Sequence, residues 1–534
     1  MTASRRALAV CLALAVFHTW PLASAPGRLS LNYNADAQQG EWTLAWIAHI
    51  LPRAPAHLFD GNIFAPERAT LAYSEPMIAP ALLGAPIRWL GGSPVLTYNI
   101  VLIAGLTLTA WAGWFVVWRW TGSFGAAIVA GALTGFNAHL LTRLPHIMAA
   151  HAWGIPLSLY FADRLAEQPN RRDASRLALT VLGTAATSIY WLAVVGLVVA
   201  VVMAVNARRW RSVSAIALAS LGGLALALPV LWPYLQAAGG GASRPLSMVA
   251  QFSASPAGYL TSLSRVHKAW TSRFFTDEVN VLFAGITALG LAVAGALWAV
   301  REASQRRRVM TMAVAAGVAM LLSFGPATAI YRWLYDWVWP LRGLRAVARF
   351  GYLYLMVVAM AAGFGVAWLQ RRARSPTAST AMAGVALILV SMETWSGPIR
   401  TEPFTRVPPV YRVLAHTGAP VMLVEVPFYP ATMVFENGEY VLNATEHWQP
   451  VMNGTSGVTP MSYRARADLF WFFPRDWAID AIERDEATHI MVHLEKFSAS
   501  EVQDIEQSLP HRHELQLIAA DPSGHRLYRI TRNR

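Results

Sequence analysis

The stretch PVLTYNIVLIAGLTLTAWAGWFVVW, residues 94–118, decides the fold class of this chain. It contains no charged residue, and an apolar helix of about 17–25 residues can cross the hydrocarbon core of a bilayer. Comparable apolar runs recur along most of the chain. They lie at approximately residues 7–23, 124–141, 148–163, 213–235, 280–300, 309–330, 350–369 and 379–396. The sequence therefore predicts a mainly α-helical bundle that crosses a membrane many times.

The composition supports a membrane protein and argues against other classes. Of the 534 residues, 55% are hydrophobic and only 14% are charged, whereas a soluble domain carries about 25% charged residues. The formal net charge of +13 does not indicate nucleic-acid binding, because no basic stripe is interleaved with stacking aromatic residues. The single Cys11 excludes an internal disulfide and a thiolate metal cluster.

Basic clusters predict the sidedness of the chain, because Lys and Arg are enriched in cytoplasmic loops. We assign six such clusters to the cytoplasm, and they lie at residues 2–6, 118–120, 164–176, 206–211, 301–308 and 370–375. This predicts about eleven passages, with the N-terminus cytoplasmic and residues 24–93, 236–279, 331–349 and everything after 397 external. The first run also resembles a cleavable signal peptide, but Pro26 after the small residues favours an uncleaved helix.

Two apolar segments do not fit a single crossing. Residues 76–92 are short and broken by Pro and Gly, which indicates an interfacial or re-entrant helix. Residues 177–205 have basic residues at both ends, so we expect a hairpin of two helices that turns near Ser188, Tyr190 and Trp191. Non-helical backbone at this depth is tolerated only beside protein or a water-filled cavity. Both segments therefore point to one external cavity.

The composition changes after Trp395, and we predict a membrane domain over residues 1–396 and an extracytoplasmic mixed α/β domain over 397–534. PVMLVEVPFY (420–429) and THIMVHL (488–494) read as buried strands. Ser498 and Glu501 have the spacing of a capping box at a helix start. Residues 513–532 read as two strands around a Pro-Ser-Gly turn.

The first external loop holds several carboxylates. Asp36 precedes the segment EWTLAWIAHIL (41–51), in which Trp42, Trp46 and His49 share one helical face. We expect this helix to lie flat on the membrane interface and to hold Asp36 over the cavity as a general base. Asp60 and Glu75 are candidates to orient an acceptor, whereas Glu41 and Glu67 read as solvated loop residues.

A second signal is WPLRGLRAVARFGY, residues 339–352. Arg342, Arg345 and Arg349 recur at intervals of three and four, so a helix would place them on one side. Guanidinium groups bind phosphate oxygens in bidentate fashion, which predicts a lipid-phosphate site. Attachment to ordinary lipid headgroups is the alternative.

Two further segments carry candidate binding residues. Arg143 and His146, in a short external turn, could contact a substrate, whereas His151 reads as a core residue. His447 and Trp448 lie in a loop, 440–457, that is dense in Asn, Thr and aromatic residues. That composition suits a sugar-binding loop and a tightly turned docking loop equally well. No nucleotide-binding loop, HExxH motif or Cys/His zinc spacing is present in the sequence, which argues against a tightly bound transition metal in the site.

With these residues in view, the chain resembles the bacterial membrane glycosyltransferases of the GT-C superfamily. The resemblance rests on the blocks TWPL (19–22), DAQQGEWTLAWIAHIL (36–51), HLFDGNIFAPERATLAYSE (57–75), LPHIMAAHAWGIPLSL (144–159), LLSFGP (321–326), RGLRAVARFGYL (342–353) and ATEHWQPVMNGTSGVTP (444–460). It implies transfer of a sugar from a polyprenyl-phosphate donor to a glycan, lipid or protein acceptor, at the external face of the bacterial inner membrane. Such an enzyme would serve cell-envelope biogenesis.

The resemblance also implies residue roles. GT-C enzymes use an acid in the first external loop, which is the position of Asp36, and Arg342, Arg345 and Arg349 would match a donor-phosphate site. Many members have two adjacent acids where this chain has Ala35-Asp36-Ala37, so no cofactor is certain and a divalent cation stays open. The rival functions are a non-enzymatic transporter or assembly partner for lipid-linked saccharides, and an oligosaccharide ligase or polymerase of unrelated fold that does not need Asp36.

Overall fold

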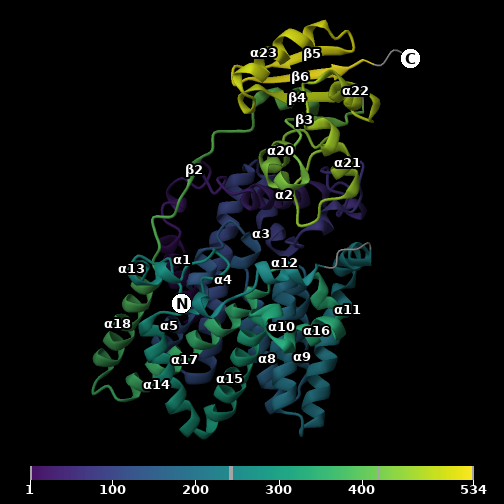
Figure 1. Cartoon of the computed structure of the whole chain (residues 1–534). Coiled ribbons are helices and arrows are strands. Elements are labelled where there is room, and N and C mark those ends of the chain that lie inside the picture. Colours follow the sequence, from purple (N-terminus) through teal and green to yellow (C-terminus); the bar gives the residue numbers. More distant parts are fainter. Residues whose placement is uncertain (1–2, 240–243, 419, 532–534) are drawn as a thin grey trace. The chain divides into compact units, whose positions relative to one another are not determined.

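A computed structural model describes residues 3–239, 244–418 and 420–531 of the chain, which is mainly helical (Figure 1). The predicted external region 236–279 and the second tail strand each extend over a few residues outside these ranges. The chain forms two compact units. The helical unit comprises residues 1–25, 76–80 and 99–400, and the sheet unit comprises 26–75, 81–98 and 401–534.

The helical unit is a bundle of long apolar helices. They are α1 (Ala3–His18), α4 (Pro94–Thr121, which starts in the sheet unit), α5 (Phe124–Gly135), α8 (Gly154–Glu167), α9 (Arg171–Ala185), α10 (Ile189–Val205), α11 (Trp210–Gly239), α14 (Ile286–Arg301), α15 (Ala303–Ser323), α17 (Gly351–Arg371) and α18 (Pro376–Thr394). Short helices lie in the connections, and they are α6 (Ala138–Leu141), α7 (Ile147–Ala150), α12 (Leu246–Gln251), α13 (Lys268–Thr271) and α16 (Ala329–Trp337). Helix α17 is central, because it packs against α5, α14, α15 and α18.

The contact between α14 and α17 depends on two glycines that let the backbones approach closely. A Cβ atom on Gly295 would lie 2.0 Å from the carbonyl oxygen of Ala361, and one on Gly365 would lie 2.1 Å from that of Leu291. Without side chains at these positions, the two helices make close van der Waals contact, which is the usual means of association in lipid.

Four helices are long and apolar enough to cross a membrane, within the residues that the structure describes. They are α4, α11, α18 and the helix that contains α17, while α5, α10 and α14 are apolar but shorter. The predicted break near Ser188 is confirmed, because α9 ends at Ala185 and the Ser188 side chain caps the start of α10. The other irregular segment, residues 76–92, contains the helix α3 (Ile78–Trp89), which has Pro86 inside it. The count of about eleven passages stays a prediction.

The sheet unit is built around four strands in the order β3-β4-β6-β5 (Figure 1). The strands are β3 (Leu423–Val426), β4 (His489–His493), β5 (Leu515–Ala520) and β6 (His525–Ile530); β3 and β4 are parallel and the other pairs antiparallel. The helices of this part are α19 (Arg412–Ala415), α20 (Gly438–Asn443), α21 (Met461–Phe470), α22 (Asp476–Arg484) and α23 (Ala499–Ser508). All four predicted strands and the capping box of Ser498 and Glu501 are confirmed.

The first predicted external loop belongs to this same unit. Strand β1 (Leu29–Ser30) pairs with β2 (Glu402–Pro403), and α2 (Ala35–Ile50) packs against α20. Further along the loop, the Ala65 N–H donates to the carbonyl of Val451, and the Val451 N–H donates to that of Asn62. Residue Val451 also forms a parallel bridge with Leu423 of β3. The loop is therefore an integral part of the fold of the tail.

Candidate functional site

Asp36 lies in the first turn of α2, in the sheet unit. Asn34 is the N-cap, and its side-chain oxygen accepts the backbone N–H of Asp36 at 2.9 Å. A carboxylate in the first turn of a helix is stabilised by the partial positive charge of the helix N-terminus. Asp36 is only half-buried, so its carboxylate can reach a substrate as the proposed base requires.

The prediction that α2 lies flat on the membrane interface is wrong. Trp42 is 1% exposed and Trp46 is 6% exposed, and buried residues occupy all sides of the helix. The indole N–H of Trp42 donates to Asn62, and that of Trp46 donates to the carbonyl of Leu58. Because the loop and the tail fold over α2, its aromatic face is used for packing within the protein.

Glu41 is also not the solvated loop residue that the sequence indicated. Its side chain is completely buried, and burial raises the pKa of the carboxyl well above its ordinary value, although a hydrogen bond from Asn32 opposes the rise. The Asn32 amide, oriented to donate, lies 2.8 Å from Oε1 of Glu41. Burial of this kind favours the protonated, neutral form of a carboxyl.

Two other loop carboxylates organise the loop itself. Asp60 accepts the backbone N–H of Ala69 at 3.0 Å and lies 3.0 Å from Nδ1 of His57. Burial raises the pKa of Asp60, but these two hydrogen bonds, together with the charges of His57 and Arg68, outweigh it and the net pKa is lowered. Glu67 is half-buried and accepts the hydroxyl of Ser462 on α21, so it is not a simple solvated residue. Their contacts hold the loop in shape.

Glu75 ends the first segment of the sheet unit and is 8% exposed. Its proposed role toward an acceptor stays a prediction, as does that of Asp60.

His447 and Trp448 are adjacent in sequence but differ in surroundings. His447 is 4% exposed, its Nδ1 accepts the N–H of Gln449, and its ring stacks on Tyr411; burial lowers its pKa to about 3. Trp448 is half-buried and stacks on His49 with 4.0 Å between ring centroids. Their roles in substrate binding stay predictions, and of the two only Trp448 is partly accessible.

Backbone strain concentrates in the same part of the sheet unit. Phe64, Ala69 and Trp448 have φ values of 59°, 53° and 60°, a left-handed region that bulky residues rarely adopt. Such strain costs about 1–3 kcal/mol per residue and persists where the surrounding structure imposes it, often at functional sites. The first loop and the loop around Trp448 are therefore the most tightly constrained segments near Asp36.

In the helical unit, the predicted helix over the three arginines is wrong. The segment forms two 3₁₀ turns, η7 (Trp339–Gly343) and η8 (Val347–Phe350), which flank Arg345. The Pro-containing stretch cannot continue a regular helix through this segment. Arg342 makes its hydrogen bonds within the protein, because its guanidinium donates to the carbonyls of Tyr335 and Asp336 at the end of α16.

Arg345 and Arg349 are different from Arg342. The Arg349 guanidinium lies 4.2 Å from the ring centroid of Tyr190, and the Arg345 guanidinium lies 4.7 Å from that of Phe252. The Tyr190 hydroxyl accepts the backbone N–H groups of Arg345 and Ala346, which fixes this turn. Among the residues that the structure describes, neither guanidinium donates a hydrogen bond to a protein acceptor or pairs with a carboxylate.

Arg143 and His146 belong to the same cationic region as Arg349, because all three act on His139. The charges of Arg143, Arg349 and His146 all act on His139, which is 1% exposed in α6. On the other side, burial and the charge of Arg345 lower the pKa of Arg244. The structure thus brings together Arg143, His146, Arg345 and Arg349, and adds His139 and Arg244, which sequence reasoning missed.

The sequence contained a signal for His139. Asn137 caps α6 by accepting the N–H of Leu140. The helix predicted over 124–141 is therefore interrupted at Asn137, and His139 lies in the short helix that follows. No comparable signal marks Arg244, which is placed by the pairing of its N–H with the Arg342 carbonyl.

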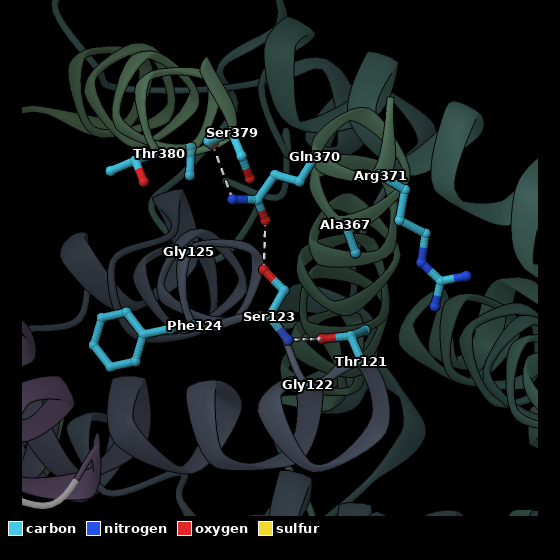
Figure 2. Close-up of a pocket in the computed structure, with 11 residues that line it drawn as sticks. Thr121, Gly122, Ser123, Phe124, Gly125, Ala367, Gln370, Arg371, Ser379 and Thr380 are labelled. Atoms are coloured by element: carbon cyan, nitrogen blue, oxygen red, sulfur yellow. Dashed lines mark hydrogen bonds between the residues drawn. The ribbon is translucent and has the colours of Figure 1, made fainter. Parts of the chain in front are cut away.

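A cavity of about 500 Å³ lies elsewhere in the helical unit (Figure 2). It is formed by the α4–α5 turn, the end of α17 and the start of α18, and Gln370 bridges it by accepting from Ser123 and donating to the Ser379 carbonyl. Arg371 is the one charged residue in its lining. This cavity contains no acid or histidine, so it does not offer a catalytic site.

The overall fold is shared with solved glycosyltransferase structures. The arabinofuranosyltransferase AftD from Mycobacteria is 16% identical with a TM-score of 0.61, over 99% of this chain and 40% of that chain. The oligosaccharyltransferase AglB from Archaeoglobus fulgidus, in complex with an inhibitory peptide and a dolichol-phosphate, is 13% identical with a TM-score of 0.50, over 99% of this chain and 74% of that chain. This chain spans about two-fifths of the AftD length. No family model and no curated protein matches the chain.

These similarities show the fold. The chain shares the fold of these solved glycosyltransferase structures, which agrees with the resemblance of its sequence to the GT-C superfamily. Its apolar helices agree with a multi-pass membrane protein.

Proposed function

We propose that this protein is a glycosyltransferase that moves a sugar from a polyprenyl-phosphate donor to an acceptor outside the cytoplasm. The observation that carries the proposal is the pair of guanidinium groups on Arg345 and Arg349, which have aromatic neighbours but, within the described ranges of the chain, no carboxylate partner. Buried or half-buried cations require a counterion, and a lipid-linked phosphate supplies one. The fold, which is shared with an arabinofuranosyltransferase and an oligosaccharyltransferase, supports glycosyl transfer as the activity.

The chemistry follows from the donor. The acceptor hydroxyl oxygen attacks the anomeric carbon, the bond from that carbon to the phosphate oxygen breaks, and the phosphate leaves with the bonding electrons. Because phosphate is a good leaving group, no general acid is required at the departing oxygen. Asp36 removes the proton of the attacking hydroxyl, and Arg345 and Arg349 stabilise the negative charge that develops on the phosphate.

The other binding residues receive secondary roles. Arg143 and His146 extend the cationic region around His139, which suits further phosphate or sugar oxygens. Arg342 acts by holding α16 in place. A divalent cation stays open, and Asp36 is the carboxylate of the first loop that is best placed to share one.

The proposal is tested in a deletion strain whose lipid-linked saccharides and surface glycans are isolated and compared with those of the parent. We expect the deletion to accumulate a lipid-linked sugar and to lose a glycan component. Plasmid-borne wild-type protein should restore the glycan, and Asp36→Asn should not, although the variant is present in membranes at the same level.

The matched control is Asp504→Asn, which changes an exposed carboxylate on α23 and should restore the glycan fully. If Asp36→Asn restores it as well, Asp36 is not the base and a transport or assembly role replaces the proposal.

A further inference from the structure

A cluster of histidine and carboxylate side chains lies at one end of the sheet, apart from every residue discussed above. His493 ends β4 and His525 begins β6, and the two are directly opposite in the antiparallel pair. Side chains at opposite positions share one face of a sheet. Nδ1 of His493 lies 3.3 Å from Oε1 of Glu495, and Nε2 of His525 lies 3.6 Å from the same oxygen.

These separations suit a single metal ion. The ligand atoms of His493, Glu495 and His525 all lie within 4.8 Å of one another. Tetrahedral zinc has nitrogen and oxygen ligands at about 2.0–2.2 Å, which places neighbouring ligand atoms about 3.3–3.6 Å apart. Two histidines and one carboxylate are also a ligand set that zinc uses in proteins.

The surroundings of both histidines provide a second, independent observation. The other nitrogen of each ring meets its own carboxylate: Nε2 of His493 lies 2.7 Å from Glu425, and Nδ1 of His525 lies 2.8 Å from Asp521. Histidines that bind metals usually donate their outer N–H to a carboxylate or carbonyl, which turns the free lone pair toward the metal. Here that arrangement occurs twice.

The charge balance also favours a cation. Three carboxylates, of Glu425, Glu495 and Asp521, face the two rings, and Glu425 is completely buried. Lys496, the nearby cation in sequence, pairs with Glu439 instead. Glu495 is 39% exposed, so its carboxylate is open to solvent. Water and ions can therefore enter from this side.

We propose that His493, Glu495 and His525 bind a divalent transition metal, for which zinc is the best match, with a fourth position open to water beside Glu495. The site links the end of β4 to the start of β6. Its existence does not depend on the proposed glycosyl transfer. The metal-free alternative is a protonated His493 between Glu425 and Glu495, and the experiment distinguishes the two.

The experiment uses the full chain, purified in detergent through a tag that contains no histidine. We expect about one zinc per chain by elemental analysis, and, after removal by a chelator, uptake of about one Co²⁺ with the visible absorption of a tetrahedral site. Glu495→Gln and His525→Asn should lose this uptake by at least 100-fold in affinity. Asp521→Asn should weaken it by about 10–100-fold, as expected when an outer carboxylate is removed.

The matched control is His489→Asn, which changes another buried histidine of β4 whose Nδ1 bonds to Thr488 instead. It should bind as wild type does. Elution volume and thermal unfolding show which variants are folded, and Glu495→Gln keeps the test valid if His525→Asn fails to fold, because it is isosteric and partly exposed. The proposal is overturned if wild-type protein takes up neither Zn²⁺ nor Co²⁺, or if Glu495→Gln binds them equally well.

Discussion

The carboxylates of the sheet unit and the arginines of the helical unit differ in how their charges are satisfied. In the sheet unit Asp60, Glu67 and Glu425 accept hydrogen bonds from nearby protein groups, and burial raises the pKa of Glu41. In the helical unit the guanidinium groups of Arg345 and Arg349 lie against aromatic rings. The first set completes the fold, whereas the second set makes no ion pair with a carboxylate among the residues that the structure describes.

This difference gives a means of separating structural charges from functional ones. A charge that is paired within the protein should affect stability when it is removed, because its partner is left buried and unpaired. A charge without a protein partner should affect substrate binding or turnover and leave stability nearly unchanged. Arg342 tests the rule within the helical unit, since its guanidinium donates to protein carbonyls.

The largest effect is expected for Glu425→Ala. Removal of one partner from a completely buried pair costs about 3–5 kcal/mol, and His493 and the Tyr411 hydroxyl would both lose their acceptor. Urea unfolding followed by tryptophan fluorescence measures the loss. Glu514→Ala, which changes an exposed residue in the turn just before β5, should change stability by less than about 0.5 kcal/mol. A loss below about 1 kcal/mol for Glu425→Ala would contradict the structural role.

The next effect is expected for Arg349→Ala, which should lower kcat/KM for the lipid donor by about 10²–10³-fold, or about 2.7–4 kcal/mol. Its melting temperature should stay close to that of wild type. Arg342→Ala serves as the contrast, since it should lower the melting temperature while kcat/KM falls by less than about 10-fold. The comparison is contradicted if Arg349→Ala lowers the melting temperature while Arg342→Ala causes the larger fall in kcat/KM.

A smaller effect concerns the pH dependence of stability. The pKa of Glu41 is raised in the folded protein, so the folded state binds more protons than the unfolded state above pH 4.5. Wild-type stability should therefore fall as pH rises through this window, by at most about 1.4 kcal/mol per pH unit from this group. Glu41→Gln should remove that slope and be the more stable protein at pH 8. Parallel stability curves for the two proteins would show that Glu41 is ionised in the fold.

The smallest effect is expected for Asn34→Ala. Loss of an N-cap side chain costs about 1 kcal/mol of stability, and Asn34 also orients the helix turn that carries Asp36. We expect a small drop in unfolding free energy and a larger drop in turnover, which Asn34→Ser should largely restore. Equal turnover in Asn34→Ala and wild type would show that Asp36 does not depend on its cap.

Local patterns predicted much of this fold. The apolar runs, the break at Ser188, the strands of the tail and the capping box of Ser498 each depend on neighbours in sequence, and all are present. The burial of α2 was not predicted, because α2 packs against α20, and its partner Asn62 donates to Ala444, both of which are far from α2 in the sequence. The burial of Glu41 was missed for the same reason.

The residues of the candidate site were likewise predicted only in part from the sequence. Residue types identified Arg345, Arg349, Arg143 and His146, and the structure groups the last three with His139. Spacing alone suggested that Arg342 belongs with the other two arginines, but its contacts with the end of α16 come from the turns that replace the expected helix. The cluster of His493, Glu495 and His525 was not predicted from the sequence, because it forms only when β4 and β6, which are distant in sequence, pair with each other.

The pairing of β1 with β2, and of the loop residues Asn62 and Ala65 with Val451, has a consequence for membrane insertion. Segments that exchange backbone hydrogen bonds must be delivered to the same compartment. The chain between residues 75 and 401 must therefore pass through the bilayer an even number of times. During synthesis, β1 must also stay without its partner strand until more than half of the polypeptide has been inserted and β2 has been made.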